Sequence, residues 1–154
     1  MKVVRSSELP WSDAIAHGPF LQRRKALGGK KLSCGLWELA PGKKSFPFHL
    51  HHVTEEALFV VSGNAKVRTP EGLTAIGPGD FVHFPAGGPP HQLVNDGDEP
   101  VVYVAMAAVS GVDVVEYPDS AKVAAAVGDY PATKRFSFRA ADGHIDYFDG
   151  EPEE

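Results

Sequence analysis

From residue 32 onward, the chain alternates between short apolar runs and short polar turns. The runs are rich in valine, leucine and phenylalanine, and the turns carry glycine, proline and aspartate. In chain order the turn sequences are Pro-Gly, Ser-Gly, Pro-Glu-Gly, Gly-Pro-Gly-Asp, Gly-Gly-Pro-Pro and Asp-Gly-Asp. Many short strands with regular turn signals are typical of an antiparallel sandwich or barrel. We therefore expect an all-β fold.

One hairpin can be placed from its turn. The sequence Thr-Pro-Glu-Gly at 69–72 has proline at its second position and glycine at its fourth, as type I turns prefer. This predicts that residues 65–68 pair with residues 73–76. Because side chains alternate along a strand, Ala65 and Val67 should then share one face.

Two further segments do not alternate clearly. Residues 101–109 are almost wholly apolar, which predicts a strand that is buried on both faces. Residues 120–127 indicate a short helix, with Ser120 as its N-cap and Gly128 at its end. Because so brief a helix is not stable alone, we expect it to pack on the barrel.

The domain organisation is inferred from the positions of proline and glycine and from the lack of repeats and linkers. No internal repeat and no linker rich in proline or serine divides the sequence, which favours a single domain. Proline and glycine interrupt residues 1–30, so we expect an irregular N-terminal arm that leads into a first strand. A barrel core should span residues 31–118. The extension 119–154 should pack on that barrel, with its acidic end disordered.

Composition and charge exclude some classes of protein. The 154 residues are 43% hydrophobic and 23% charged, with 16 Gly and 13 Pro, which suits a globular, turn-rich domain. The net charge is −5 and no basic stripe is present, so we expect no nucleic-acid partner. The sequence has no apolar run long enough to cross a membrane and no apolar signal core near Met1. We expect a cytoplasmic protein that does not bind membranes.

Three of the seven histidines lie together just after a Pro-Gly turn, in the sequence Pro-Phe-His-Leu-His-His-Val-Thr-Glu-Glu. In an extended strand, His49 and His51 point the same way, and His52 points to the opposite face. Two imidazoles with a carboxylate from a neighbouring strand make a metal site for Zn, Fe, Ni, Mn or Cu. Either Glu55 or Glu56 can supply that carboxylate.

Two observations extend this candidate site. On the predicted strand 56–61, Glu56 shares a face with Leu58 and Val60, so it is the metal ligand if that face is interior. A fourth candidate, His91, opens a strand directly after the loop Pro-Ala-Gly-Gly-Pro-Pro, whose proline and glycine would fix its approach.

These residues resemble the two motifs of the cupin superfamily. Glycine, HxH, glutamate and glycine of the first motif match Gly42, His49, His51, Glu56 and Gly63. Glycine, PxG, histidine and asparagine of the second match Gly79, Pro85, Gly87, His91 and Asn95. Each motif is one residue longer than usual, after Gly42 and after Gly87.

The resemblance implies a jelly-roll β-barrel with a metal inside its mouth. The implied ligands are His49, His51, Glu56 and His91, and the implied cofactor is one divalent transition metal: Zn, Fe, Mn or Ni. Segments outside the motifs look like a group of small single-domain bacterial cupins, some of which carry loose sugar-phosphate isomerase labels. The similar segments are 69–72, 117–120 and 146–151.

Two further residues are candidates for supporting roles. Tyr103 can donate a proton or a hydrogen bond into the pocket, although packing in the core explains a tyrosine there equally simply. His83 can hydrogen-bond a ligand or substrate if it faces the interior, and otherwise it is an exterior residue of a half-buried sheet.

Three functions fit this set of residues. The first is a small-molecule metalloenzyme of the isomerase, lyase or dioxygenase type. The second is a non-catalytic module that binds a small carbohydrate or carboxylate, and the third is a metal site that mainly stabilises the barrel. Because small barrels often cover their exposed strand edges with a second copy, we also expect a homodimer.

Overall fold

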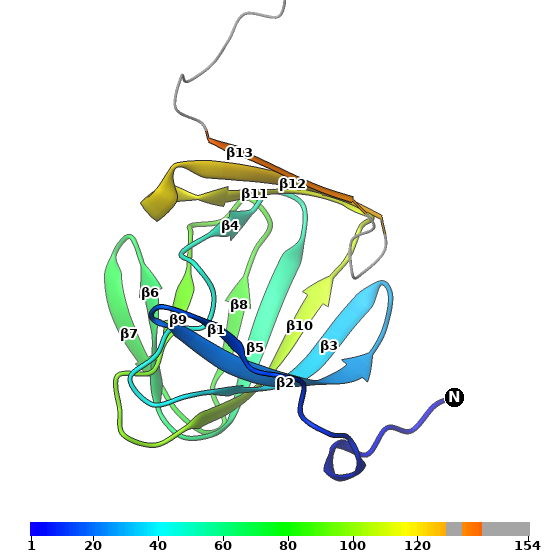
Figure 1. Cartoon of the computed structure of the whole chain (residues 1–154), viewed down its shortest axis with the longest axis vertical. Helices are drawn as coiled ribbons and strands as arrows, with labels where there is room; N and C mark the ends of the chain where they lie inside the picture. Colours follow the sequence, from blue (N-terminus) through cyan, green and yellow to red (C-terminus); the bar gives the residue numbers. More distant parts are fainter. Residues whose placement is uncertain (129–133, 140–154) are drawn as a thin grey trace, which may run out of the picture.

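The computed structural model describes residues 1–128 and 134–139, and within them the chain is built almost entirely of strands (Figure 1). The helical elements there are two 3-10 turns, η1 (Ser6–Glu8) and η2 (Pro118–Ser120). The strands are β1 (Ile15–His17), β2 (Phe20–Gly28), β3 (Leu32–Leu39), β4 (Leu50–His51), β5 (Glu55–Ser62), β6 (Ala65–Thr69), β7 (Gly72–Ile76), β8 (Phe81–Phe84), β9 (Gln92–Val94), β10 (Val101–Ala108), β11 (Val112–Tyr117), β12 (Lys122–Val127) and β13 (Lys134–Arg139).

The strands form two antiparallel layers. One layer is a six-stranded sheet in the order β1-β2-β3-β10-β5-β8. The other combines a four-stranded sheet, β13-β12-β11-β4, with a three-stranded sheet, β7-β6-β9. An antiparallel bridge between His49 and His91 connects these two smaller sheets. This arrangement confirms the expected all-β jelly-roll barrel.

The core lies between the six-stranded sheet and the three-stranded sheet. Leu39, Val60 and Val101 are fully buried from one side, and Val67 and Leu93 close the core from the other. Burying each such side chain stabilises the fold by about 1.5–3 kcal/mol. Since Val60 faces inward, Glu56 at the start of the same strand faces the interior as well.

The hairpin predicted from its turn is present. Strands β6 and β7 pair from Ala65 opposite Ile76 to Thr69 opposite Gly72. Ala65 and Val67 are both 4% exposed, so they share the buried face as the alternation requires.

The turn between β5 and β6 shows why one motif position is glycine. Gly63 has a φ of +78°, a left-handed conformation that side chains rarely adopt. A Cβ atom there would lie 2.5 Å from the carbonyl oxygen of Pro100. Both the backbone conformation and the space therefore exclude a larger residue.

The helix predicted for residues 120–127 is wrong. Only η2 is helical, and β12 pairs along its whole length with β11 on one side and β13 on the other. Alanine favours a helix locally, but an isolated turn or two of helix gains less than two complete strand pairings. The expected burial of strand 101–109 on both faces is also wrong, because Val102 and Val104 on the outer face are only half-buried.

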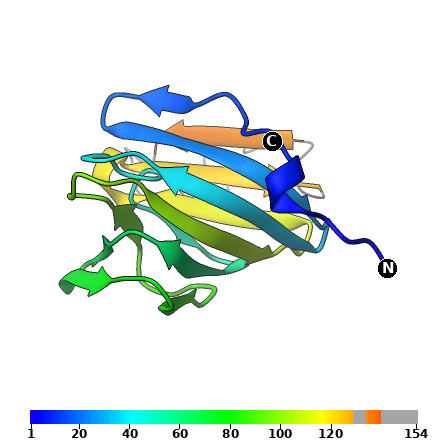
Figure 2. The same cartoon turned by 90° about the horizontal axis from the view of Figure 1, so that it is seen from below.

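The N-terminal segment is more ordered than an irregular arm. β2 pairs with β3 over most of its length, and β1 pairs with β2, so residues 15–28 belong to the six-stranded sheet. Figure 2 shows both strands running alongside the rest of that sheet. The predicted disorder of the acidic end falls on residues outside the described part of the chain.

The four-stranded sheet lies across one end of the barrel (Figure 1). Within this sheet β4 pairs with β11, and the bridge from His49 to His91 next to β4 connects the sheet to the barrel. A bidentate ion pair between Arg68 on β6 and Asp119 in η2 makes a second connection. Across the residues described, no helix combines the length and apolar character needed to traverse a bilayer.

Candidate metal centre

β4 and the bridge beside it bring three histidines together. His49 and His51 lie on one face, with ring centroids 5.0 Å apart. The backbone N–H of His91 donates to the carbonyl of His49 at 2.8 Å, and that of His49 donates back at 3.2 Å. This pairing places the His91 ring 4.8 Å from the His49 ring, although the two residues are far apart in sequence.

Glu56 supplies a carboxylate to the same point. Its Oε2 atom lies 3.8 Å from Nε2 of His49, 3.5 Å from Nε2 of His51 and 3.4 Å from Nε2 of His91. The structure therefore brings together all four of the ligands implied by the sequence. Within this set, His49, His51 and Glu56 each offer one donor atom within 4.8 Å of the others.

The other ring nitrogen of two histidines is held by a hydrogen bond. Nδ1 of His49 donates to the carbonyl of Pro47 at 2.7 Å, and Nδ1 of His51 donates to the carboxylate of Asp113. A donating Nδ1–H leaves the Nε2 lone pair free in the neutral ring. Both free Nε2 atoms face Glu56, which is the orientation that a metal ligand needs.

Asp113, on β11, is a site residue that the sequence analysis missed. Its Oδ2 binds His51, and its Oδ1 accepts the backbone N–H groups of Val53 at 3.1 Å and Thr54 at 3.3 Å. The carboxylate thus fixes both the His51 ring and the turn that leads to Glu56. The available signal was an acid within an otherwise valine-rich strand, Val-Asp-Val-Val.

The pKa shifts of Glu56 and His91 favour the protonation states in which these side chains can bind a metal. Burial raises the pKa of Glu56, but its interactions with His49, His91 and His51 outweigh burial and bring the pKa well below its usual value. Burial lowers the pKa of His91, and the opposing effect of Glu56 only partly compensates. Glu56 is therefore ionised and His91 neutral at neutral pH, as metal coordination requires.

His51 and Asp113 behave as a coupled pair. Burial lowers the pKa of His51, but the hydrogen bond with Asp113 and the charges of Glu56 and Asp113 raise it by more. Burial raises the pKa of Asp113, and the hydrogen bond with His51 outweighs that effect and lowers it. The pair therefore keeps the Asp113 carboxylate ionised and available to orient the ring.

The surroundings of His91 are apolar. Its ring stacks on Phe84, with centroids 3.7 Å apart and planes 9° from parallel, and its Nδ1 atom has no hydrogen-bond partner among the described residues. A cavity of about 200 Å³ adjoins this ring, with Val67, Ile76 and Phe84 in its wall. It is smaller than the pockets of drug-sized ligands, about 300–1,000 Å³, and so suits a small molecule.

The donor set fits a metal ion. Three imidazole nitrogens and one carboxylate oxygen suit first-row transition metals and leave coordination positions for water or substrate. The convergence of the donors and the oriented rings of His49 and His51 point to the same conclusion. These residues can therefore hold one divalent ion, and several first-row ions satisfy the set equally.

The two candidate supporting residues do not join this group. His83 lies opposite Ala57, so it faces outward, and its Nε2 binds Glu55 at 2.5 Å. Of the two alternatives for His83, this is the exterior position on a half-buried sheet. Tyr103 is in the core, and its hydroxyl donates to Gln22 at 3.1 Å. Besides Phe84, Tyr117 also lies against a site histidine, stacked on His49 with centroids 6.1 Å apart.

Antiparallel strands place three histidines and one glutamate around a common point inside the barrel. Residues 35–107 match the family model described as Cupin domain. Over these residues the chain is similar to cupin domains. No sequence among the curated proteins matches it.

Solved structures show the same fold. A protein of Acidithiobacillus ferrooxidans, provisionally described as a sugar phosphate isomerase, is 26% identical, covers 94% of this chain and 96% of its own, and has a TM-score of 0.81. A cupin-superfamily sugar phosphate isomerase of Silicibacter pomeroyi is 21% identical over 95% of this chain and 98% of its own, with a TM-score of 0.78. A Thermotoga maritima protein provisionally named an oxalate decarboxylase is 21% identical over 70% of this chain and 99% of its own, with a TM-score of 0.63.

Proposed function

We propose that this protein binds one divalent transition metal through His49, His51, Glu56 and His91 and uses it as an enzyme acting on a small molecule. The observation that carries the proposal is the convergence of three Nε2 atoms on Oε2 of Glu56, at 3.4–3.8 Å. The ion would be Zn, Fe, Mn or Ni, all of which accept these donors.

Bound there, the metal would supply Lewis acidity or redox chemistry to a coordinated substrate. The chain itself would do three things. Asp113 and the Pro47 carbonyl orient the rings of His51 and His49, and Glu56 contributes a charge that partly neutralises the ion. The four-stranded sheet, which lies across the end of the barrel, would limit the access of water to the site.

The reaction would be of the isomerase, lyase or dioxygenase type. Solved neighbours named sugar phosphate isomerase and oxalate decarboxylase support the first two types as candidates. The cavity beside His91 supports a second candidate function, non-catalytic binding of a small ligand, because its wall is mostly apolar and offers few groups that could move protons.

Metal content of the untagged full-length protein tests the proposal. After loading with each of the four ions, the wild type should retain about one ion per chain, measured by mass spectrometry of the metal. His51→Ala should lose it, and His52→Ala is the matched control because His52 points outward to Glu116. Circular dichroism would show that both variants fold. Equal metal content in the two variants, or a wild type that retains no ion, would refute the proposal.

A further inference from the structure

One face of the four-stranded sheet is turned toward the metal centre. Residues opposite each other in an antiparallel pair lie on the same side of the sheet. His51 is opposite Val115, Val115 is opposite Ala124, and Ala124 is opposite Ser137. Since His51 points to the metal centre, the same face carries the side chains of β11, β12 and β13 that alternate with it: Asp113, Val115, Tyr117, Lys122, Ala124, Ala126, Arg135, Ser137 and Arg139.

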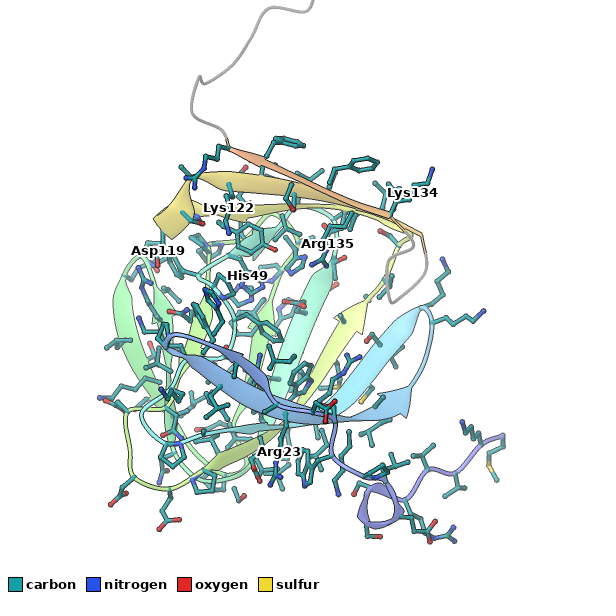
Figure 3. The ribbon with its side chains drawn as sticks, viewed as in Figure 1. Arg23, His49, Asp119, Lys122, Lys134 and Arg135 are labelled. Atoms are coloured by element: carbon teal, nitrogen blue, oxygen red, sulfur yellow. The ribbon has the colours of Figure 1, made fainter. Side chains whose placement is uncertain are left out.

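Two rows on this inward face end in cations. Arg139 lies opposite Lys122, which lies opposite Tyr117, and Arg135 lies opposite Ala126, which lies opposite Asp113. Figure 3 shows Arg135 on the inner side of the sheet, in the direction of His49, whereas its neighbour Lys134 points away. The strand register therefore places these cations on the face of the sheet that is turned toward the metal centre.

Both cations are placed beside residues that contact the site histidines. Nζ of Lys122 lies 5.3 Å from the centroid of the Tyr117 ring, and that ring stacks on His49. Arg135 lies opposite Ala126, which lies opposite Asp113, the residue that binds His51.

These two cations lack acidic partners of the kind that Arg23, Lys66 and Arg68 have. Arg23 binds Glu38 at 2.7 Å, Lys66 binds Asp96 at 2.5 Å, and Arg68 binds Asp119 at 2.6 Å. Within residues 1–128 and 134–139, no carboxylate forms an ion pair with Arg135 or Lys122. The small side chains of Ala124, Ala126 and Ser137 lie on the same face as these two cations.

We propose that Arg135 and Lys122 bind the anionic group, a carboxylate or a phosphate, of the small molecule whose other end reaches the metal. This inference rests on the proposed function and adds a substrate class to it. The guanidinium of Arg135 can hold two oxygens of such a group, and Lys122 adds a second charge. In a chain of net charge −5, a local group of inward cations attracts anions that the rest of the surface repels.

Titration with two simple anions tests the inference. Calorimetry at pH 7 and constant ionic strength would follow inorganic phosphate and, separately, acetate binding to the zinc-loaded full-length protein. Arg135→Gln should weaken binding of the preferred anion about 10-fold or more, because it removes a charge-assisted hydrogen bond. Lys122→Gln should weaken it less, and Arg135→Lys should restore part of the loss. Lys134→Gln, the outward neighbour, should leave the affinity unchanged.

The outcomes separate this inference from the metal assignment. If zinc is retained but Arg135→Gln binds both anions as tightly as the wild type does, the anion site is wrong and the metal site stands. Absence of saturable binding of either anion to the wild type also overturns the anion site. If the wild type holds no zinc, titration of the metal-free protein still decides whether anion affinity depends on Arg135. A stronger response to phosphate or to acetate identifies which of the two groups the site prefers.

Discussion

Asp113 determines the position of His51 more directly than any other residue. One oxygen accepts a hydrogen bond from the ring N–H of His51, and the other accepts hydrogen bonds from two backbone N–H groups. The backbone therefore holds the carboxylate in the position from which it orients the imidazole. Such outer hydrogen bonds keep the ligand tautomer and raise the basicity of the ring. His49 receives a weaker version of this support, from the neutral carbonyl of Pro47.

Replacing Asp113 should therefore weaken the metal site without removing a ligand. We expect Asp113→Asn to reduce metal affinity by about 10- to 100-fold, because the amide neither attracts the ring proton as strongly nor carries charge. Competition with a chromophoric chelator would measure the change. Glu116→Gln is the matched control, since Glu116 makes the corresponding bond to the exposed His52. Equal affinities in the two variants would contradict the role of Asp113.

At the residue scale, sequence reasoning reached the four metal-site candidates but not their partners. The alternation of a strand grouped His49 with His51, and the resemblance to the cupin motifs selected Glu56 and His91. Asp113 and Arg135 enter the site through the register of β11 with β4 and of β13 with β12. No local pattern specifies which distant strand becomes a neighbour.

Short strand elements carry the site because both of their edges are paired. β4 comprises only Leu50 and His51, yet β11 pairs with it on one side and the His49–His91 bridge continues the layer on the other. This explains how a segment too short to be stable alone presents two histidines in fixed positions.

The ion pair between Arg68 and Asp119 should give the attachment of the four-stranded sheet a pH dependence. The hydrogen bond to Arg68 lowers the pKa of Asp119 below its usual 3.8. A lowered carboxyl pKa stabilises the fold at pH values above the unfolded-state pKa, and this contribution is lost as the pH falls through the folded-state pKa. At pH 7, Asp119→Asn should cost about 0.2–1 kcal/mol, the range for solvent-exposed ion pairs.

Urea unfolding of the wild type and of Asp119→Asn, at pH 7 and again below pH 3.8, would measure this effect. The stability difference should be present at pH 7 and should narrow in acid. Asp98→Asn, at an exposed position, should show neither the cost nor the narrowing. A difference that is the same at both pH values would show that the ion pair does not stabilise the attachment.

At the element scale, sequence reasoning succeeded where a turn fixed the pairing and failed where distant strands did. The Thr-Pro-Glu-Gly turn determines the β6–β7 pairing by itself. The alanines of β12 favour a helix locally, and only its two long-range partners, β11 and β13, make it a strand. The placement of β2 inside the six-stranded sheet depends in the same way on β3.

At the scale of the whole molecule, apolar and charged surroundings lie on different sides of the centre. Phe84 and the small cavity adjoin His91, while Tyr117 stacks on His49 and Lys122 lies over the Tyr117 ring. A bound molecule with an apolar part and an anionic part would therefore have one orientation. That asymmetry links the fold to the proposed chemistry more specifically than the metal ligands alone.

The expected homodimer stays a prediction. The outer face of the six-stranded sheet exposes Phe59 by 40%, Val61 by 47% and Phe81 by 61%, and Phe59 lies directly opposite Phe81. An apolar surface beside a free strand edge is typical of an interface between copies. Small-angle scattering should give twice the mass of one chain, and a monomer at all concentrations tested would refute the prediction.

The central claim is that four side chains hold one ion inside the barrel. Anomalous X-ray diffraction from crystals of the metal-loaded protein locates such an ion directly. We predict a single peak within coordination distance of Nε2 of His49, His51 and His91 and of the Glu56 carboxylate, about 2.0–2.2 Å for each donor. A loaded protein whose ion lies elsewhere, or whose four side chains turn away from a common point, would contradict the account.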